Sequence, residues 1–559
     1  MTELYSTGSL TSGKGIIIGL AAPIGVNLDL LITEIEKSLS RFRTKKPVTI
    51  HVIEENPWYH TYGQNFLKGA FKRKQELVTS NLAKMLYKIA LGDSIRGIEL
   101  NGQDYKGPWP DIFAEIAINK INDTLLSELK ILSEINEKEK SFDLYNIFFV
   151  RQIKRKEEVY RLRRAYGRAF FLISVSSSVE ERKNYLAKSI FNIDFSNANN
   201  IQQELIDKLI ELDLDEEKDY FGQRVSEVFP LGDFFINLSW SSFKKEVERF
   251  IDLIFGIPKT PTVDESAIFH AYAASLCSSD ISRQVGACLI NEKGDILSTG
   301  FNELPNINGG PVRDDTLKIR DIDQFPIIRS SHEKKQQILI DFIESFLDKK
   351  SIINIDEKEI EEIIQSITED PKSQINKMDI TRTVHAEMTA ITTAARLGQE
   401  INGSTLFVTT FPCTNCTKHI ISSGIKKVVY IEPYPKNMIL QYYPKLIKII
   451  DIAKESQQND DGVIFTQFIG VSPFRYIELF ARNLQDTPYN INKVIEKVNI
   501  SSYKEIPMKL EQIIRIDFPK DNGSLIELNK NDKYRKEIES MLTNNLKKKE
   551  TEYESLIPS

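Results

Sequence analysis

The sequence predicts an α/β protein built from two sheet-containing domains. Short apolar segments of strand length alternate with charged, amphipathic segments of helix length, a pattern typical of parallel sheets covered by helices on both faces. The chain has 559 residues, which is too many for one hydrophobic core. A segment rich in Gly, Pro and Thr around residues 255–262 indicates a linker. We therefore expect domains at 1–257 and 258–480, followed by an extension at 481–559.

The composition is that of an ordinary soluble globular protein. Charged residues make up 27% of the chain and apolar residues 41%, and the net charge of −6 gives no overall attraction to nucleic acid or to anionic membranes. Four cysteines in this length fit a reducing compartment better than a disulfide framework. The first residues lack a secretory signal pattern and no apolar run reaches membrane-spanning length. We expect a cytoplasmic protein without a membrane span.

The first domain begins with an apolar strand at Gly15, a glycine-containing turn and an amphipathic helix, which is the context of a phosphate-binding P-loop. The P-loop pattern itself is degenerate. Gly19 and Gly25 are present, but Val26 stands where the phosphate-binding Lys belongs and Asn27 where the Mg²⁺-binding Ser or Thr belongs. Because a charge-assisted phosphate contact is missing, we expect no kinase activity.

Further strands of the first domain are expected at 47–53, 144–150 and 169–175, which predicts a parallel sheet with helices on both faces. The stretch 151–168 is basic, so it could bind a nucleotide phosphate or an RNA backbone, or it could be a solvated helix face. We favour the solvated helix face. Residues 151–182 resemble the second half of P-loop domains of the nucleoside-monophosphate-kinase type. That resemblance implies a nucleotide as the ligand of this domain.

The strongest motif lies in the second domain. His385-Ala-Glu387 is followed by Pro-Cys413-x-x-Cys416, with Cys413 lying 28 residues after the His. One imidazole and two thiolates are three protein ligands for Zn²⁺ and leave a fourth position for water, so we expect one Zn²⁺ per chain. Glu387 is then the proton-transferring residue rather than a ligand. Both parts of the motif should start helices, so that two helix N-termini meet at the metal.

A purely structural zinc site is the alternative interpretation of this motif. Such a site needs a fourth protein ligand. The other two cysteines, Cys277 and Cys288, fall in an expected core helix and an expected core strand. We therefore favour a catalytic site.

The motifs of the second domain resemble deoxycytidylate (dCMP) deaminases in order and spacing. The matching segments are Ser278-x-Asp280, Arg283–Ala287, Gly300-Phe-Asn302-x-x-Pro305, His385-Ala-Glu387, Pro412-Cys-x-x-Cys416 and Gly424–Val429. The resemblance implies a cytidine-deaminase-like α/β/α sandwich with a five-stranded mixed sheet, and hydrolysis of a deoxycytidine nucleotide to the deoxyuridine nucleotide. It also implies that Asn302 binds the sugar–base region of the substrate, although an Asn at this position also suits a turn.

Three further residues are candidate substrate contacts. Ser278 belongs to the segments that match the family, while Tyr434 and Lys436 follow an expected strand at 428–431 and would reach the phosphate. An exposed loop pair is an equally good interpretation of Tyr434 and Lys436. Cys277 stands where family members often carry Arg, which puts the phosphate end of the site in question.

A charged insertion at about 313–380 also departs from the family pattern. Amphipathic helices are expected within it at 339–347 and 360–367. Because the insertion ends just before His385, it would suit a lid over the site or an assembly surface.

The fusion of a degenerate P-loop domain to a dCMP-deaminase-like domain resembles a group of bacterial anti-phage cytidine nucleotide deaminases. That resemblance implies conversion of dCMP or dCTP to dUMP or dUTP and ammonia, which would deplete dC nucleotides during infection. It also implies a homo-oligomer and, as in some members, an inhibitory RNA.

Three other functions fit the sequence less well. A housekeeping dCMP deaminase for thymidylate synthesis does not need an extra domain of roughly 250 residues. A deaminase that edits RNA or single-stranded DNA should have a basic groove with stacking aromatics, whereas this domain is mixed in charge. A nucleotide-sensing scaffold with a decayed site should have lost a ligand or Glu387.

Overall fold

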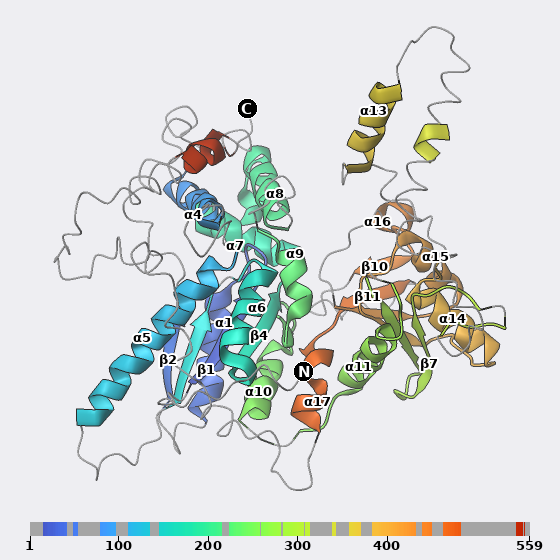
Figure 1. The fold of residues 1–559 in the computed structure, drawn as a ribbon, viewed down its shortest axis with the longest axis horizontal. Coiled ribbons are helices and arrows are strands. Elements are labelled where there is room, and N and C mark those ends of the chain that lie inside the picture. The colour runs from blue at the N-terminus through green and yellow to red at the C-terminus, as the bar shows by residue number, and fades with distance from the viewer. Residues whose placement is uncertain are drawn as a thin grey trace. The chain divides into compact units, whose positions relative to one another are not determined.

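A computed structural model shows how this sequence folds. The structure describes residues 15–41, 48–53, 79–96, 110–134, 145–151, 153–214, 223–255, 257, 259–280, 283–306, 308–313, 338–341, 357–369, 383–431, 439–449, 462–481, 544–551 and 553. The chain divides into two compact units, the first made of Met1–Thr260 with Ile469–Ser559 and the second of Pro261–Phe468. Each unit contains a six-stranded sheet with helices packed on it, which confirms the predicted α/β class (Figure 1).

The sheet of the first unit is parallel except at one edge. Its strands run in the order β12-β5-β4-β1-β3-β2, and only the two-residue β12 is antiparallel to its neighbour. The strand bounds are β1 (Gly15–Ala21), β2 (Val48–Ile53), β3 (Tyr145–Val150), β4 (Phe170–Ser176), β5 (Phe234–Asn237) and β12 (Gly470–Val471). The strands predicted at 47–53, 144–150 and 169–175 are thus confirmed to within one residue. β1 and β4 are buried along their whole length because both have helices on either face.

Two helical layers cover this sheet, and alternate residues of β1 show which layer covers which face. Ile16 and Ile18 pack with α1 and α10, whereas Ile17 packs with α5 and α6 on the opposite face. A third apolar cluster lies among α4, α5, α7 and α8. The helix bounds are α1 (Leu28–Ser40), α4 (Ser80–Arg96), α5 (Ile112–Glu134), α6 (Lys156–Tyr166), α7 (Val179–Phe191), α8 (Asn200–Leu214), α9 (Val225–Val228) and α10 (Phe243–Ile254).

The sheet of the second unit is mixed and has the strand order β10-β11-β9-β8-β6-β7. β6 runs antiparallel to β7 and β8, and the other neighbours are parallel. The strand bounds are β6 (Gly286–Ile290), β7 (Ile296–Phe301), β8 (Thr405–Val408), β9 (Lys427–Tyr430), β10 (Ile447–Ile449) and β11 (Val463–Gln467). The resemblance implied five strands, and that count was wrong, since the described residues form six.

Glycines in β6 and β7 let helices approach both faces of this sheet. A Cβ on Gly286 would lie 1.8 Å from Ala271 O of α11, and one on Gly300 would lie 2.2 Å from Ala386 O of α14. Because Gly300 pairs with Ala287, the neighbour of Gly286, the two glycines face opposite sides of the sheet. The helix bounds are α11 (Val263–Ser275), α13 (Glu357–Glu369), α14 (Ala386–Arg396), α15 (Thr414–Ser422) and α16 (Ile439–Tyr442). α13 confirms the helix predicted at 360–367.

The chain returns to the first unit after β11, which differs from our expectation that the second domain extends to residue 480. Only β11 joins the second sheet, while β12 pairs with β5 and is followed by α17 (Pro473–Phe480). Arg475 fixes this return segment, because its Nε donates to Asp233 Oδ1 at 3.2 Å and its Nη2 to Phe170 O at 2.5 Å. The second unit is therefore an insertion in the first. Across the part of the chain that the structure describes, no helix is long and apolar enough to cross a membrane.

Candidate active site

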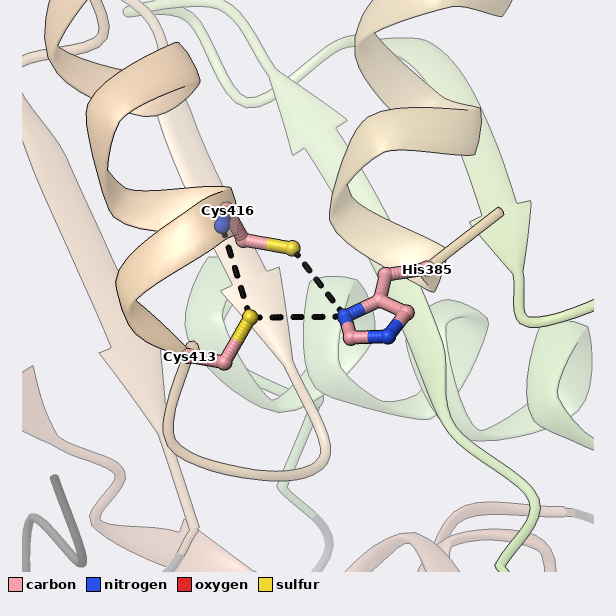
Figure 2. Close-up of side chains that lie close together, drawn as sticks. All are labelled: His385, Cys413 and Cys416. Atoms are coloured by element: carbon pink, nitrogen blue, oxygen red, sulfur yellow. Dashed lines mark hydrogen bonds between the residues drawn. The ribbon is translucent and has the colours of Figure 1, made fainter. Parts of the chain in front are cut away.

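The three predicted metal ligands lie together in the second unit. His385 Nδ1 is 3.4 Å from Cys413 Sγ and 3.4 Å from Cys416 Sγ (Figure 2). All three ligand atoms lie within 4.8 Å of one another. Ligands about 2.0–2.3 Å from one tetrahedral Zn²⁺ would be roughly 3.5–3.8 Å apart, so the donor set and its spacing fit zinc. Within the described residues, neither Cys277 nor Cys288 joins a group of this kind.

Two helix N-termini bring the ligands together, as the sequence predicts. His385 is the N-cap of α14, and Cys413 is the N-cap of α15, where its Sγ accepts the Cys416 N–H at 3.4 Å. The loop before Cys413 is anchored by Phe411, whose ring packs edge-on against Tyr430 with centroids 4.7 Å apart. The cation site thus receives two sets of N-terminal backbone N–H groups, which favour thiolate over thiol.

The two thiols of the site differ in acidity. A hydrogen bond with Cys416, aided by one with His385, lowers the pKa of the Cys413 thiol to about 4. The hydrogen bond with Cys413, together with burial, raises the pKa of Cys416 above its ordinary value. A thiolate beside an imidazole is therefore present at neutral pH, which is the donor pair that a borderline-soft divalent cation prefers.

Glu387 lies in the first turn of α14, two residues after His385, and is 3% exposed. Burial raises the pKa of its carboxyl, and the nearby Cys413 adds to that shift. The carboxyl also has a hydrogen bond with Cys416, so it borders the ligand group without belonging to the His–Cys–Cys set. A buried carboxyl next to a cation site can carry a proton between two reacting groups.

Comparison with known proteins places this site in a family. Residues 262–432 match the model of the cytidine and deoxycytidylate deaminase zinc-binding region. The deoxycytidylate deaminase of Enterobacteria phage T2 is 33% identical over 167 residues, which cover 30% of this chain and 78% of the phage protein. The chain belongs to the deoxycytidylate deaminase family. It is accordingly a hydrolase that acts on C–N bonds, and its matched region is the zinc-binding one.

Two further proteins are similar to this chain. The deoxycytidylate deaminase of Enterobacteria phage T4 is 31% identical over 169 residues, which cover 30% of this chain and 76% of that protein. The dCMP deaminase of cyanophage S-TIM5, whose crystal structure holds dCMP and dUMP, is 19% identical in sequence to this chain. The structural match has a TM-score of 0.19 and covers 38% of this chain and 100% of the cyanophage chain. The family match lies in the second unit.

Asn302, the expected sugar–base contact, is buried and holds its own loop. Its Oδ1 accepts the Val285 N–H at 2.7 Å, and its Nδ2 donates to Asp280 Oδ2 at 3.1 Å and to Arg283 O at 2.9 Å. Ser278, the second expected contact, donates from Oγ to Asn302 O at 2.6 Å. These contacts favour the turn-forming role that we weighed for Asn302, and contact with the deaminase substrate stays a prediction.

The other predicted site residues have separate outcomes. Tyr434 and Lys436 lie outside the described residues. Cys277 is exposed just beyond α11 rather than buried in it as expected, and Arg313 Nη1 lies 3.7 Å from its Sγ. Cys288 is buried in β6, as predicted, and burial raises its pKa to about 12, so this thiol stays protonated.

The residues of the degenerate P-loop serve the packing of the first unit. Gly19 lies inside β1, where an added Cβ would meet the Ile153 side chain at 2.5 Å. Gly25 has φ +86°, which suits glycine, and Val26 is buried in the core. Asn27 caps α1, its Oδ1 accepting the Leu30 N–H at 3.3 Å.

Sequence reasoning missed Glu303, which organises the approach to His385. Its Oε2 accepts the Ser279 N–H at 2.9 Å and its Oε1 the Leu304 N–H at 2.9 Å. Its backbone forms an antiparallel bridge with Val384, next to His385. The available signal was an acidic side chain directly after Asn302, at the end of a strand, where free backbone N–H groups need acceptors.

Proposed function

We propose that the protein deaminates deoxycytidine nucleotides, dCMP, dCTP or both, to the deoxyuridine nucleotides and ammonia. The observation that carries this proposal is the convergence of His385, Cys413 and Cys416, with buried Glu387 beside them, in the family-matching region. The relatives are named for dCMP, which supports a deoxycytidine nucleotide as substrate.

His385, Cys413 and Cys416 would hold the zinc ion, one per chain. A zinc ion bound there supplies the Lewis acidity that makes water available as a nucleophile at neutral pH. The three side chains fix where that cation lies, and their anchoring by two helix N-termini and the Phe411–Tyr430 contact keeps the geometry preorganised.

Glu387 would carry the protons of the reaction. It takes a proton from the attacking water, delivers it to the pyrimidine ring nitrogen, and passes the second proton to the departing amino group as the C4–N bond breaks. Water is thereby added and ammonia released, with no net gain or loss of protons by Glu387. Its position in the first turn of α14 keeps its carboxyl next to the ligand group throughout.

The test is ammonia release by the purified, zinc-loaded protein, offered dCMP, dCTP, CMP, cytidine and single-stranded DNA separately. Turnover confined to the deoxycytidine nucleotides is the expected result. Turnover of the oligonucleotide alone would replace the proposal with polynucleotide editing. Zinc-loaded, folded protein that turns over none of these compounds would refute it.

We further propose that this activity depletes dC nucleotides during phage infection. The insertion of the family-matching unit into a unit with a parallel sheet supports this role over a housekeeping one, because the added unit is far larger than deamination requires. Cells that express the wild-type chain should lose dCTP and resist phage, whereas cells that express Glu387→Ala should do neither. An inhibitory RNA and a homo-oligomer belong to the same proposal, and nucleic-acid content and light scattering of the purified protein test them.

A nucleotide is the proposed ligand of the first unit. Ligands of parallel sheets bind at the carboxyl ends of the strands, where the order of connection reverses, and here that place is the end of β1 between β3 and β4. Lys154 and Arg182 bring positive charge to the following loop, donating to Ala22 O at 2.9 Å and to Ile24 O at 2.8 Å. Calorimetric titration with ATP and dCTP, using a chain with Glu387→Ala, tests for binding without turnover.

A further inference from the structure

The last described helix of the chain packs into the first unit. Residues 544–551 and 553 form this tail helix, drawn in red beside α4 in Figure 1. Tyr553 is 0% exposed and belongs to the apolar cluster built by α4, α5, α7 and α8. Lys549 is 6% exposed, whereas Lys547 and Lys548 on the same helix are exposed. One face of the tail helix, with Lys549 and Tyr553 four residues apart, is therefore buried in the first unit.

Lys549 completes a buried ionic network. Its Nζ lies 3.4 Å from Asp93 Oδ2, and Asp93 Oδ1 accepts a hydrogen bond from Arg96 Nη1 at 3.3 Å. Arg96 also donates to Glu158 Oε1, through Nη2 at 2.8 Å and through Nε at 3.1 Å. These four side chains carry two positive and two negative charges, which balance only with Lys549 in place. Withdrawing Lys549 leaves an excess negative charge among them in the interior, which is unfavourable.

The network continues to the loop between β1 and α1. Glu158 Oε2 accepts the backbone N–H of Lys154 at 2.9 Å and that of Arg155 at 3.1 Å. The buried Lys154 side chain in turn donates from Nζ to Ala22 O in the β1–α1 loop at 2.9 Å. Consecutive polar contacts therefore join the tail helix to that loop.

We propose that the apolar cluster built by α4, α5, α7 and α8 is a docking surface for a helix with Lys and Tyr four residues apart. The chain's own tail helix is its occupant, and docking sets the position of Lys154 at the β1–α1 loop. A helix this short is marginal in water by itself, so folding and docking of the tail helix occur together. Undocking removes Lys549 from Asp93 and Tyr553 from the apolar cluster in one step, which makes the tail a two-state latch on the first unit.

Hydrogen exchange on the full-length protein tests the latch, and its readout does not depend on turnover. Lys549→Ala and Tyr553→Ala should each speed amide exchange at least tenfold in α4 and in residues 22–27. Lys547→Ala, on the exposed face of the same helix, is the matched control and should stay within twofold of wild type. Faster exchange in α4 with wild-type exchange in residues 22–27 would overturn the proposal.

A charge-neutral pair distinguishes the latch from a general loss of folding. Asp93→Asn and Lys549→Gln should each speed exchange in residues 22–27, because each leaves an unbalanced charge. The double variant restores an uncharged hydrogen-bonding pair and should exchange more slowly than either single variant. If the increases in exchange rate of the two single variants simply add up in the double variant, Asp93 and Lys549 are not coupled and the proposal is contradicted.

Discussion

Replacing Gly300 by Ala should impair the proposed deamination without altering any candidate catalytic side chain. A Cβ at this position would lie 2.2 Å from Ala386 O and 2.3 Å from Ala390 N, both backbone atoms of α14. Since carbon contacts of this kind are normally about 3.5 Å, α14 must move away from β7 by roughly 1–1.5 Å. The first turn of α14 holds Glu387, and its N-cap is His385, so the site shifts with the helix.

The expected effect has a structural and a catalytic part. Overpacking of this kind costs about 1–3 kcal/mol, which corresponds to a fall in Tm of roughly 2–12 °C for a unit of this size. A displacement of about 1 Å near the reacting groups can lower the rate on the order of 10²-fold. Calorimetry gives the Tm, and ammonia release from dCMP and dCTP gives kcat/KM.

Gly398→Ala is the matched control for Gly300→Ala. Gly398 has φ +68° and nothing within 4 Å of an added Cβ, so Ala there is strained by about 1–2 kcal/mol without pushing any neighbour. Its Tm should fall as in Gly300→Ala while kcat/KM stays near wild type. Wild-type kcat/KM in Gly300→Ala, or equal losses of kcat/KM in both variants, would refute the packing argument.

Four further predictions follow from the same contacts. Glu387→Ala should keep its zinc but lose about 10²–10⁴-fold in kcat, while the exposed Glu292→Ala should not change kcat. Cys413→Ala should reduce the zinc content, measured by metal analysis, from one per chain toward zero. Asn302→Ala should cost about 1–3 kcal/mol in denaturant unfolding, because Val285 N–H loses its acceptor; a raised KM with unchanged stability would instead favour a sugar contact. Arg475→Ala should lower the free energy of unfolding by about 3 kcal/mol, because it breaks the buried ion pair with Asp233. This value is at the low end for such a pair because Arg163 still donates to Asp233, and an unchanged midpoint of denaturant unfolding would contradict the prediction.

The meeting of His385, Cys413 and Cys416 could be predicted because it depends on local geometry. Cys413 and Cys416 are three residues apart at the start of one helix, and His385 starts another, so each part of the motif fixes its own backbone. The sheet then brings α14 and α15 to one face, which the apolar periodicity of each helix alone does not indicate. Residue type and spacing were therefore sufficient for each half of the motif, and the metal chemistry of the combined donor set indicated that the two halves meet.

The role of Asn302 could not be fixed in the same way. A carboxamide suits a ribose hydroxyl and a turn equally well, and its chemistry is the same in both. The two roles differ in the hydrogen-bond partners of the Asn302 side chain, which here are Val285 N–H and Arg283 O. These partners are backbone groups, and because nearly every residue type carries the same backbone groups, the sequence does not identify them. The buried carboxylate of Glu303 was missed for the same reason.

The return of the chain to the first unit was equally hidden, because β12 has two residues and no periodicity of its own. Its partner β5 is also contacted by α10, through Phe234 and Phe250 with ring centroids 5.1 Å apart. In the chain, α10 comes before the second unit and β12 comes after it, and both α10 and β12 contact β5. An inserted domain needs the two chain ends of its host close together, and the shared contact with β5 keeps these two ends of the first unit close. Removal of β12 would leave β5 as an open sheet edge, so the return segment protects the edge of the first unit's sheet.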